Sequence, residues 1–94
     1  GDFNICGFNL SVIETPGHTA GSVCIQIENA IFTGDTLFFD SYGRTYFPSG
    51  NEQSLIASAK KLFALKGDFI LYSGHGESTT LERERRHNAI NYLF

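Results

Sequence analysis

The sequence predicts one α+β domain in which a mixed sheet of about four to five strands packs against two main helices. Three observations indicate this fold class. Apolar residues alternate in three segments near the N-terminus, they recur at helical spacing in one central segment, and a short apolar run precedes a second helix. The 94 residues, 41% of them hydrophobic, leave room for one modest core. A domain of this length buries roughly 60–65% of the surface of its unfolded chain.

The first three strands are indicated by alternation of apolar and polar side chains. In residues 8–14 (FNLSVIE) every second side chain is apolar, and the turn formers at 15–17 (TPG) end the strand. The same alternation in 22–27 (SVCIQI) indicates a second strand. The dipeptide 28–29 (Glu-Asn) then predicts a two-residue hairpin connection to a third strand at 30–33, because asparagine tolerates the positive φ that such turns require.

The middle of the chain combines an aromatic stretch with a helix. Residues 36–50 have no periodic pattern but are rich in aromatic side chains, so we expect a long loop that is functional or packs on itself. Apolar residues then recur at helical spacing from Leu55 to Phe63. Asn51 can cap the start of this helix, and Gly67 lies where we expect it to stop.

A buried strand and a second helix complete the predicted fold. The short apolar run at 69–72 (FILY) is typical of a buried strand. Thr79 and Glu82 match the Ser/Thr-x-x-Glu capping box, so a last helix is expected to begin near Thr79 and to run toward the C-terminus. Acids alternate with bases in 82–87 (ERERRH), which predicts a solvated helix face.

Composition disfavours several classes of partner. A net charge of −3 and a pI near 5.5 disfavour nucleic acid, since phosphate binding needs a basic face. No stretch approaches the roughly 18 consecutive apolar residues that would span a bilayer, so we expect no membrane partner. Cys6 and Cys24 are too few for a secreted disulfide framework. We therefore expect a cytoplasmic protein in which both cysteines are small buried residues.

Three potential metal ligands share one local context. His18 lies in TPGHT, Asp35 in TGD and His75 in SGHG, each beside a glycine just beyond the end of a predicted strand. If the three strands belong to one sheet and run in the same direction, these side chains can converge at one edge. Taken singly, each has an ordinary alternative as a surface or hydrogen-bonded histidine or a turn-forming aspartate. A candidate ligand beside a glycine occurs at three strand ends, and this repetition favours a shared metal site.

The chemistry of such a site follows from its donor types. Neutral imidazole nitrogens and a carboxylate suit zinc, and with open positions for water they also suit iron or manganese. A metal-bound water can lose a proton near neutral pH and act as a nucleophile, while the metal polarises the carbonyl that is attacked.

The amino-acid sequences of these motifs resemble those of a known family. TPGHTAGSV, IFTGDTLF followed by GRT, and GHGESTTLERERRHN together resemble the C-terminal half of the metallo-β-lactamase superfamily, close to its glyoxalase II-like (hydroxyacylglutathione hydrolase-like) branch. The resemblance runs from about Phe8 to Asn88 and implies half of a four-layer αββα sandwich with a dinuclear metal centre at one edge. It implies that His18 ligates the first metal, that His75 ligates the second, and that Asp35, our candidate catalytic residue, bridges the two.

One motif of that superfamily does not occur in this sequence. The family's leading motif, H-x-H-x-D-H, belongs to its N-terminal half and supplies most of the remaining ligands. Residues 1–94 are therefore interpreted either as the C-terminal half of a longer enzyme, which we expect, or as a natural half that pairs with something else. Where the hydrolase-like branch often has Asp after GRT, this chain has Tyr46. Arg44 and Tyr46 are our candidate substrate-binding residues, although an arginine in a glycine-flanked loop also has structural uses.

Three hypotheses of function follow. The first is hydrolysis of a small thioester or ester by metal-bound hydroxide, with two zinc ions in the intact protein, iron or manganese as alternatives, and little activity in residues 1–94 alone. The second is a mononuclear iron oxygenase resembling persulfide dioxygenases. The third is a non-catalytic assembly module. Half of a two-sheet sandwich leaves an apolar sheet face exposed, so we also expect a homo-oligomer.

Overall fold

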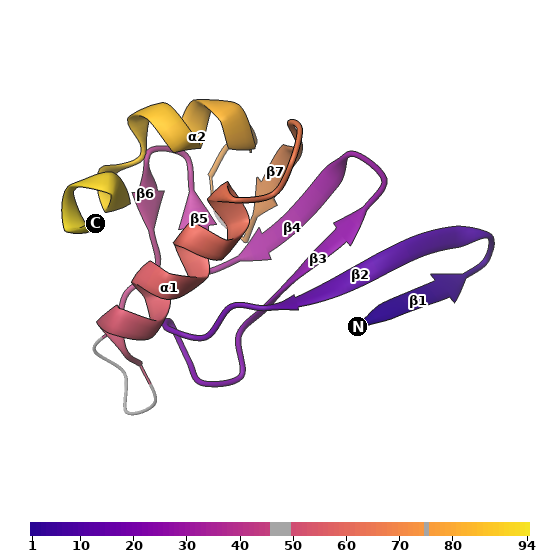
Figure 1. Cartoon of the computed structure of the whole chain (residues 1–94), viewed down its shortest axis with the longest axis horizontal. Helices are drawn as coiled ribbons and strands as arrows, with labels where there is room; N and C mark the ends of the chain where they lie inside the picture. Colours follow the sequence, from indigo (N-terminus) through magenta and orange to yellow (C-terminus); the bar gives the residue numbers. More distant parts are fainter. Residues whose placement is uncertain (46–49, 75) are drawn as a thin grey trace.

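One mixed sheet with helices on one face forms the body of the molecule (Figure 1). The computed structural model describes residues 1–45, 50–74 and 76–94, so Tyr46 and His75 lie outside the described residues. The six strands lie in the order β1 (Asp2–Ile5), β2 (Phe8–Glu14), β3 (Val23–Ile27), β4 (Ala30–Gly34), β7 (Ile70–Ser73) and β8 (Thr79–Thr80). The α+β fold class is confirmed, and the short strands β1 and β8 add to the two edges of the predicted sheet.

The pairing of the strands sets their directions. Strands β1 to β4 pair antiparallel with their neighbours, whereas β4 and β7 pair parallel. A parallel pair needs a crossover, and helix α1 (Glu52–Phe63) lies in that connection. Strands β2, β4 and β7 consequently run in the same direction, as convergence of the three predicted ligands requires.

The connections differ from the prediction in several details. The aromatic stretch contains a hairpin of two short strands, β5 (Leu37–Phe38) and β6 (Ser41–Tyr42), which was not predicted. The hairpin between β3 and β4 is confirmed, but Glu28 holds the positive φ of 52°. Asn51 caps α1 by accepting from the Ser54 amide, as predicted, and α1 ends at Phe63, before Gly67.

The C-terminal helix begins later than predicted. Helix α2 (Leu81–His87) is capped by Thr80, whose hydroxyl accepts from the Arg83 amide, and a 3-10 helix (Ala89–Leu93) follows. The predicted cap residue, Thr79, instead donates to a carboxylate within α2. The expected solvated face is correct for Arg86 and His87 but wrong for Glu84, which is fully buried.

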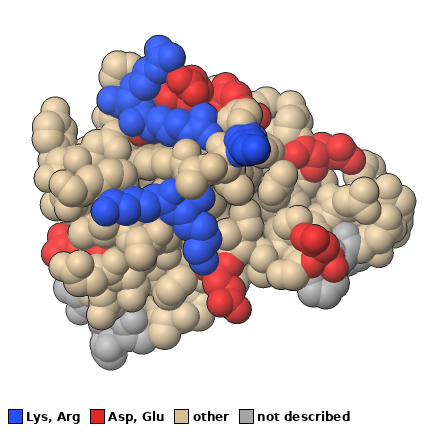
Figure 2. Space-filling model, in the orientation of Figure 1, with Lys and Arg blue, Asp and Glu red and all other residues tan. Residues whose placement is uncertain are grey.

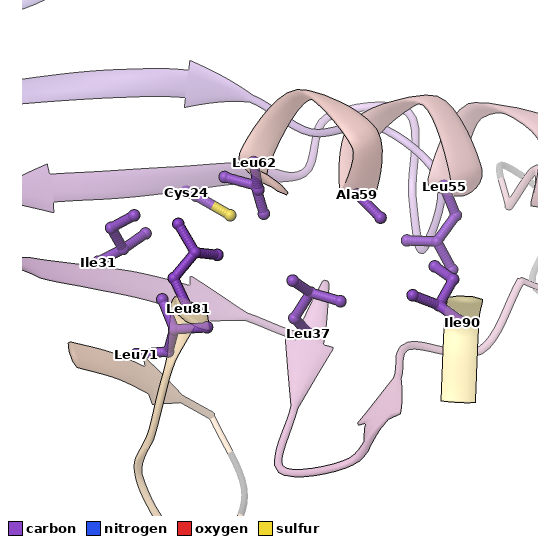
Figure 3. Packing of buried hydrophobic residues seen from close by; sticks show 9 residues of the cluster. All are labelled: Cys24, Ile31, Leu37, Leu55, Ala59, Leu62, Leu71, Leu81 and Ile90. Atoms are coloured by element: carbon purple, nitrogen blue, oxygen red, sulfur yellow. The ribbon is translucent and has the colours of Figure 1, made fainter. Parts of the chain in front are cut away.

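The core lies between α1, α2 and one face of the sheet. Figure 3 shows Leu55, Ala59 and Leu62 projecting from α1 toward side chains of the strands. The buried hydrophobic cluster comprises Cys24, Ile31, Leu37, Leu55, Ala59, Leu62, Leu71, Leu81 and Ile90. This core brings α1 onto the strand ends that carry the predicted ligands.

The opposite face of the sheet carries exposed apolar side chains. Because side chains alternate along a strand, Phe32 on β4 and Tyr72 on β7 project away from the core. Their rings stack with centroids 5.4 Å apart and remain 44% and 42% exposed. Val23 and Ile70 are exposed as well.

The two cysteines lie in different environments. Cys24 is buried in the core, as predicted, whereas Cys6 is exposed, so that expectation is wrong for Cys6. Cys6 has a φ of 52° in the tight turn between β1 and β2, and such turns lie at the surface. Among the described residues, no helix is both long and apolar enough to cross a membrane.

Shortening a side chain of α1 that packs against the sheet tests the placement of the core. We expect Leu62→Ala to lower the free energy of unfolding by about 2–5 kcal/mol, because it removes a fully buried side chain and leaves a cavity. Urea unfolding followed by circular dichroism measures the change. Lys66→Ala, an exposed position beyond α1, is the control and should change stability by no more than about 0.5 kcal/mol. Equal effects of the two variants would contradict this placement of the core.

Candidate metal centre

The loop after β2 holds His18 and is anchored on α1. The Thr15 amide donates to the carbonyl of Ser22, which closes the loop at its base. From the α1 side, the Asn51 amide donates to the Gly17 carbonyl at 2.7 Å, and the Ser58 hydroxyl donates to the Pro16 carbonyl at 2.7 Å. Hydrogen bonds from α1 and its N-cap therefore fix Pro16 and Gly17, the two residues that precede His18.

Gly17 is required both by its conformation and by its neighbours. Its φ of 147° is one that residues with a side chain rarely adopt. A Cβ at this position would collide with the backbone of Leu55 in α1. The glycine before His18 thus lets the loop lie directly against the helix.

Asp35 follows β4 at the same edge of the sheet. The Thr36 amide donates to the Thr33 carbonyl, which forms a turn around Asp35. The hydroxyls of Thr36 and Thr15 are buried and 3.2 Å apart, so the ends of β2 and β4 are joined beneath the two candidate ligands. This contact fixes the spacing between the two loops.

The end of β7 lies against Asp35. The Gly74 amide donates to the Gly34 carbonyl at 2.9 Å, and a Cβ on Gly74 would lie 3.6 Å from Asp35 Oδ1. The backbone of the residue before His75 therefore lies beside the Asp35 carboxylate. His75 itself is outside the described residues, and its predicted role stays a prediction.

The structure brings His18 and Asp35 together. His18 Nε2 lies 3.6 Å from Asp35 Oδ2, and the two side chains are 19% and 42% exposed. The other ring nitrogen, Nδ1, lies 2.7 Å from the backbone carbonyl of Arg44. A carbonyl only accepts hydrogen bonds, so Nδ1 carries the proton in the neutral ring and Nε2 presents its lone pair toward Asp35.

This arrangement fits a bound metal ion. Two ligands that share one tetrahedral zinc at about 2.0–2.2 Å lie roughly 3.4 Å apart, close to the observed separation of His18 Nε2 and Asp35 Oδ2. A metal-binding histidine commonly donates its second ring N–H to a carbonyl or carboxylate, as Nδ1 does here. No group of three possible ligands occurs within residues 1–45, 50–74 and 76–94. The described residues thus contribute a pair of donors.

Cys24 lies close to these strand ends but does not suit the role of a ligand. Burial raises the pKa of its thiol, and hydrogen bonds from Thr15 and Thr36 only partly oppose that effect. Metals bind the thiolate form, which burial disfavours. Cys24 is therefore a core residue.

The candidate substrate-binding residues have separate outcomes. Arg44 is exposed, and its backbone carbonyl, not predicted as functional, orients His18. Tyr46 falls outside the described residues. In the aromatic stretch, Tyr42 packs against the core and the Phe39 ring lies under the Arg83 guanidinium. These two contacts are structural, as the alternative interpretation of the aromatic stretch expects.

Gly43 is a site residue that sequence reasoning missed. It is buried between the two ligand loops, and a Cβ there would collide with the Asp35 carbonyl and lie 3.3 Å from the His18 Cβ. Its amide donates to the Thr36 carbonyl at 3.1 Å. The only local signal was the Gly-Arg-Thr string, which does not reveal that close approach.

The protein is thus an α+β domain with a candidate metal site at one edge of its sheet. The site consists of the His18 imidazole after β2 and the Asp35 carboxylate after β4, two strands that run in the same direction. The sequence matches the family described as Metallo-beta-lactamase superfamily over residues 7–75. The chain belongs to that superfamily.

Individual relatives agree with this assignment. Hydroxyacylglutathione hydrolase GloC of Haemophilus influenzae is 45% identical over 85 residues, which cover 87% of this chain and 40% of the relative. The crystal structure of ETHE1 from Myxococcus xanthus has a TM-score of 0.89 and 33% identity, covering 95% of this chain and 42% of that one. TTHA1623, solved in a di-iron-bound form, has a TM-score of 0.83 and 36% identity, covering 93% and 44%. The chain spans about 40% of the length of these proteins.

Substitution of Gly43 tests the geometry of the site. We expect Gly43→Ala to lower the affinity for Zn²⁺ by about tenfold or more, because a Cβ there pushes the His18 and Asp35 loops apart. Isothermal titration calorimetry on the metal-free protein measures this change. Gly21→Ala is the control, since a Cβ at Gly21 meets no atom within 4 Å. Equal Zn²⁺ affinities of the two variants would be incompatible with the described packing.

Proposed function

We propose that this chain is the C-terminal half of a metal-dependent hydrolase that cleaves a thioester or related ester of a small molecule. The observation that carries the proposal is the pair of His18 and Asp35 at one sheet edge, with the second ring nitrogen of His18 hydrogen-bonded to the Arg44 carbonyl. The similarity to hydroxyacylglutathione hydrolase GloC supports the substrate class.

Within this proposal, His18 and Asp35 hold the metal and His75 is a third ligand from the same chain. The metal, when bound, supplies an acidified water and polarises the carbonyl under attack. The chain's own residues supply orientation: the Arg44 carbonyl accepts from the protonated Nδ1, so Nε2 is the ring nitrogen that can bind a metal ion. The other ligands belong to the part of the relatives that this chain does not span, including the H-x-H-x-D-H motif.

Metal identity divides the main proposal from its alternative. Two nitrogen donors and a carboxylate suit zinc, and the same set suits iron in oxygenases. The di-iron form of TTHA1623 favours keeping iron as the second candidate, with an oxygenase resembling persulfide dioxygenases as the alternative activity. We propose zinc because hydrolysis needs a Lewis acid without redox chemistry.

We also propose that the exposed sheet face associates with a second copy of the chain. The stacked Phe32 and Tyr72 rings lie side by side in contact with water, and Val23 and Ile70 add further exposed apolar side chains to this face. Exposed apolar patches of this kind commonly mark interaction surfaces. A cytoplasmic location is proposed on the unpaired state of Cys6 and Cys24.

Loss of either donor tests the metal site. We expect His18→Ala and Asp35→Asn each to reduce Zn²⁺ binding by about tenfold or more, because each removes one of the paired donors. His87→Ala, at an exposed position on α2, is the matched control and should bind as the wild type does. Elemental analysis after aerobic purification distinguishes zinc from iron, and stoichiometric iron with oxygen uptake would favour the oxygenase.

The same preparation tests the expected inactivity of the isolated half. Residues 1–94 should show little or no hydrolysis of a hydroxyacyl thioester of glutathione, with or without added Zn²⁺, since the remaining ligands are supplied elsewhere. Thiol release provides the assay. Robust metal-dependent turnover by the 94-residue chain would contradict the proposed division of the site.

Light scattering tests the apolar face. We expect a dimer or larger oligomer for the wild type and a shift toward monomer for the double variant Phe32→Ser, Tyr72→Ser, because these stacked rings form part of the exposed patch. Tyr92→Ser is the control, since Tyr92 is 92% exposed and lies in the C-terminal 3-10 helix. A wild-type chain that is monomeric at high concentration would overturn this proposal.

A further inference from the structure

Glu84 is the most completely enclosed charged residue among those described. Its side chain is 0% exposed although it lies in the charged segment of α2. Figure 2 shows the Lys and Arg side chains gathered over the part of this face that α1 and α2 form, with acidic side chains beside them. A carboxylate is buried without a large free-energy penalty only where donors surround it.

Both oxygens of Glu84 accept hydrogen bonds, three from residues nearby in sequence and one from the distant Asp40 amide. Oε1 accepts from the Asp40 amide at 2.9 Å and from Asn88 Nδ2 at 2.8 Å. Oε2 accepts from the Thr79 hydroxyl at 2.7 Å and from Arg83 Nη1 at 3.0 Å. One of these donors, the Asp40 amide, belongs to the β5–β6 hairpin.

The β5–β6 hairpin begins just after Asp35. Asp40 lies in its turn with a φ of 63°. Asn88 also donates to the Ser41 carbonyl at 2.8 Å and more weakly to the Phe38 carbonyl, and the Ala89 amide donates to the Asp40 carbonyl. The turn is therefore held by backbone contacts as well as by the Glu84 carboxylate.

Arg83 reinforces the same turn from the other side. Its guanidinium binds both carboxylate oxygens of Asp40, at 2.5 and 3.2 Å, and lies 3.9 Å over the Phe39 ring. These hydrogen bonds hold the pKa of Asp40 below its usual range. The buried Glu84 and the paired Asp40 thus share one arginine.

The hairpin leads directly to the residue that orients His18. Strand β6 ends at Tyr42, Gly43 packs against the Asp35 carbonyl, and the Arg44 carbonyl accepts from His18 Nδ1. A shift of the hairpin would move that acceptor away from the imidazole ring.

We propose that Glu84 is a positioning residue for the metal centre, which sets the orientation of His18 through the β5–β6 hairpin. The proposal rests on the proposed function of His18 and Asp35 as metal ligands. A residue that only stabilises the fold would lower the melting temperature without changing the tautomer of His18 in molecules that remain folded.

The experiment compares Glu84→Ala, Glu84→Gln and the control Glu82→Ala in the full 94-residue chain. Glu82 lies on the same helix, is 44% exposed and pairs with Arg85 and Arg86 on the surface. Histidine side-chain ¹⁵N NMR of the metal-free protein, well below the melting temperature, reports the His18 tautomer. Titration with Zn²⁺ reports affinity.

We expect the wild type and Glu82→Ala to keep one tautomer with the proton on Nδ1. Glu84→Ala should show a mixture of tautomers and bind Zn²⁺ about tenfold more weakly or worse, as removal of residues that orient ligands commonly does. Glu84→Gln should largely restore the tautomer, because its amide oxygen can still accept from the Asp40 backbone. A folded Glu84→Ala with the wild-type tautomer and Zn²⁺ affinity would overturn the proposal.

Thr79→Val provides a second test if Glu84→Ala does not fold. This near-isosteric change removes one hydrogen bond to Glu84 and leaves the hairpin bonds in place. It should leave the His18 tautomer and the Zn²⁺ affinity unchanged, because the proposed route from Glu84 to His18 runs through the hairpin. A changed tautomer or a changed Zn²⁺ affinity in Thr79→Val would refute that route. Failure of the wild type to bind Zn²⁺ would refute the proposed function instead, and the tautomer of Glu84→Ala would still test the hairpin route.

Discussion

Strands β2, β4 and β7 point the same way because two antiparallel pairings separate β2 from β4, and the α1 crossover returns the chain parallel to β4. Their carboxyl ends therefore reach one edge of the sheet, where the loops beyond them must turn. The buried contact between the Thr15 and Thr36 hydroxyls then sets the distance between the first two of these loops. The close approach of the His18 and Asp35 side chains depends on this shared edge.

The part of the site that could be predicted from sequence is the part encoded locally. His18 and Asp35 each follow an alternating strand and adjoin a glycine, and both signals lie within a few neighbouring residues. Their convergence additionally required a common strand direction, which was a condition of the prediction and which the topology meets. The roles of His75 and Tyr46 rest on the resemblance to the family.

Other features were missed because they depend on contacts distant in sequence. The segment that contains Glu84 has the alternating charges of a solvated helix, and nothing within it reveals that the Asp40 amide supplies a donor from 44 residues away. The β5–β6 hairpin has strands of two residues each, too short for a periodic signal, and Asn88 holds its turn from the end of α2. Long-range hydrogen bonds, not local propensity, specify both features.

The groups that orient the two candidate ligands come from the same chain as the ligands. The acceptor that holds His18 Nδ1, the glycine that allows the two ligand loops to approach, and the carboxylate that holds the hairpin all belong to this chain. A ligand that is already oriented loses little conformational entropy when it binds a metal ion. In the proposed metal centre, this chain would therefore present Nε2 of His18 and the Asp35 carboxylate in a fixed arrangement, and ligands from the rest of the protein would complete the coordination.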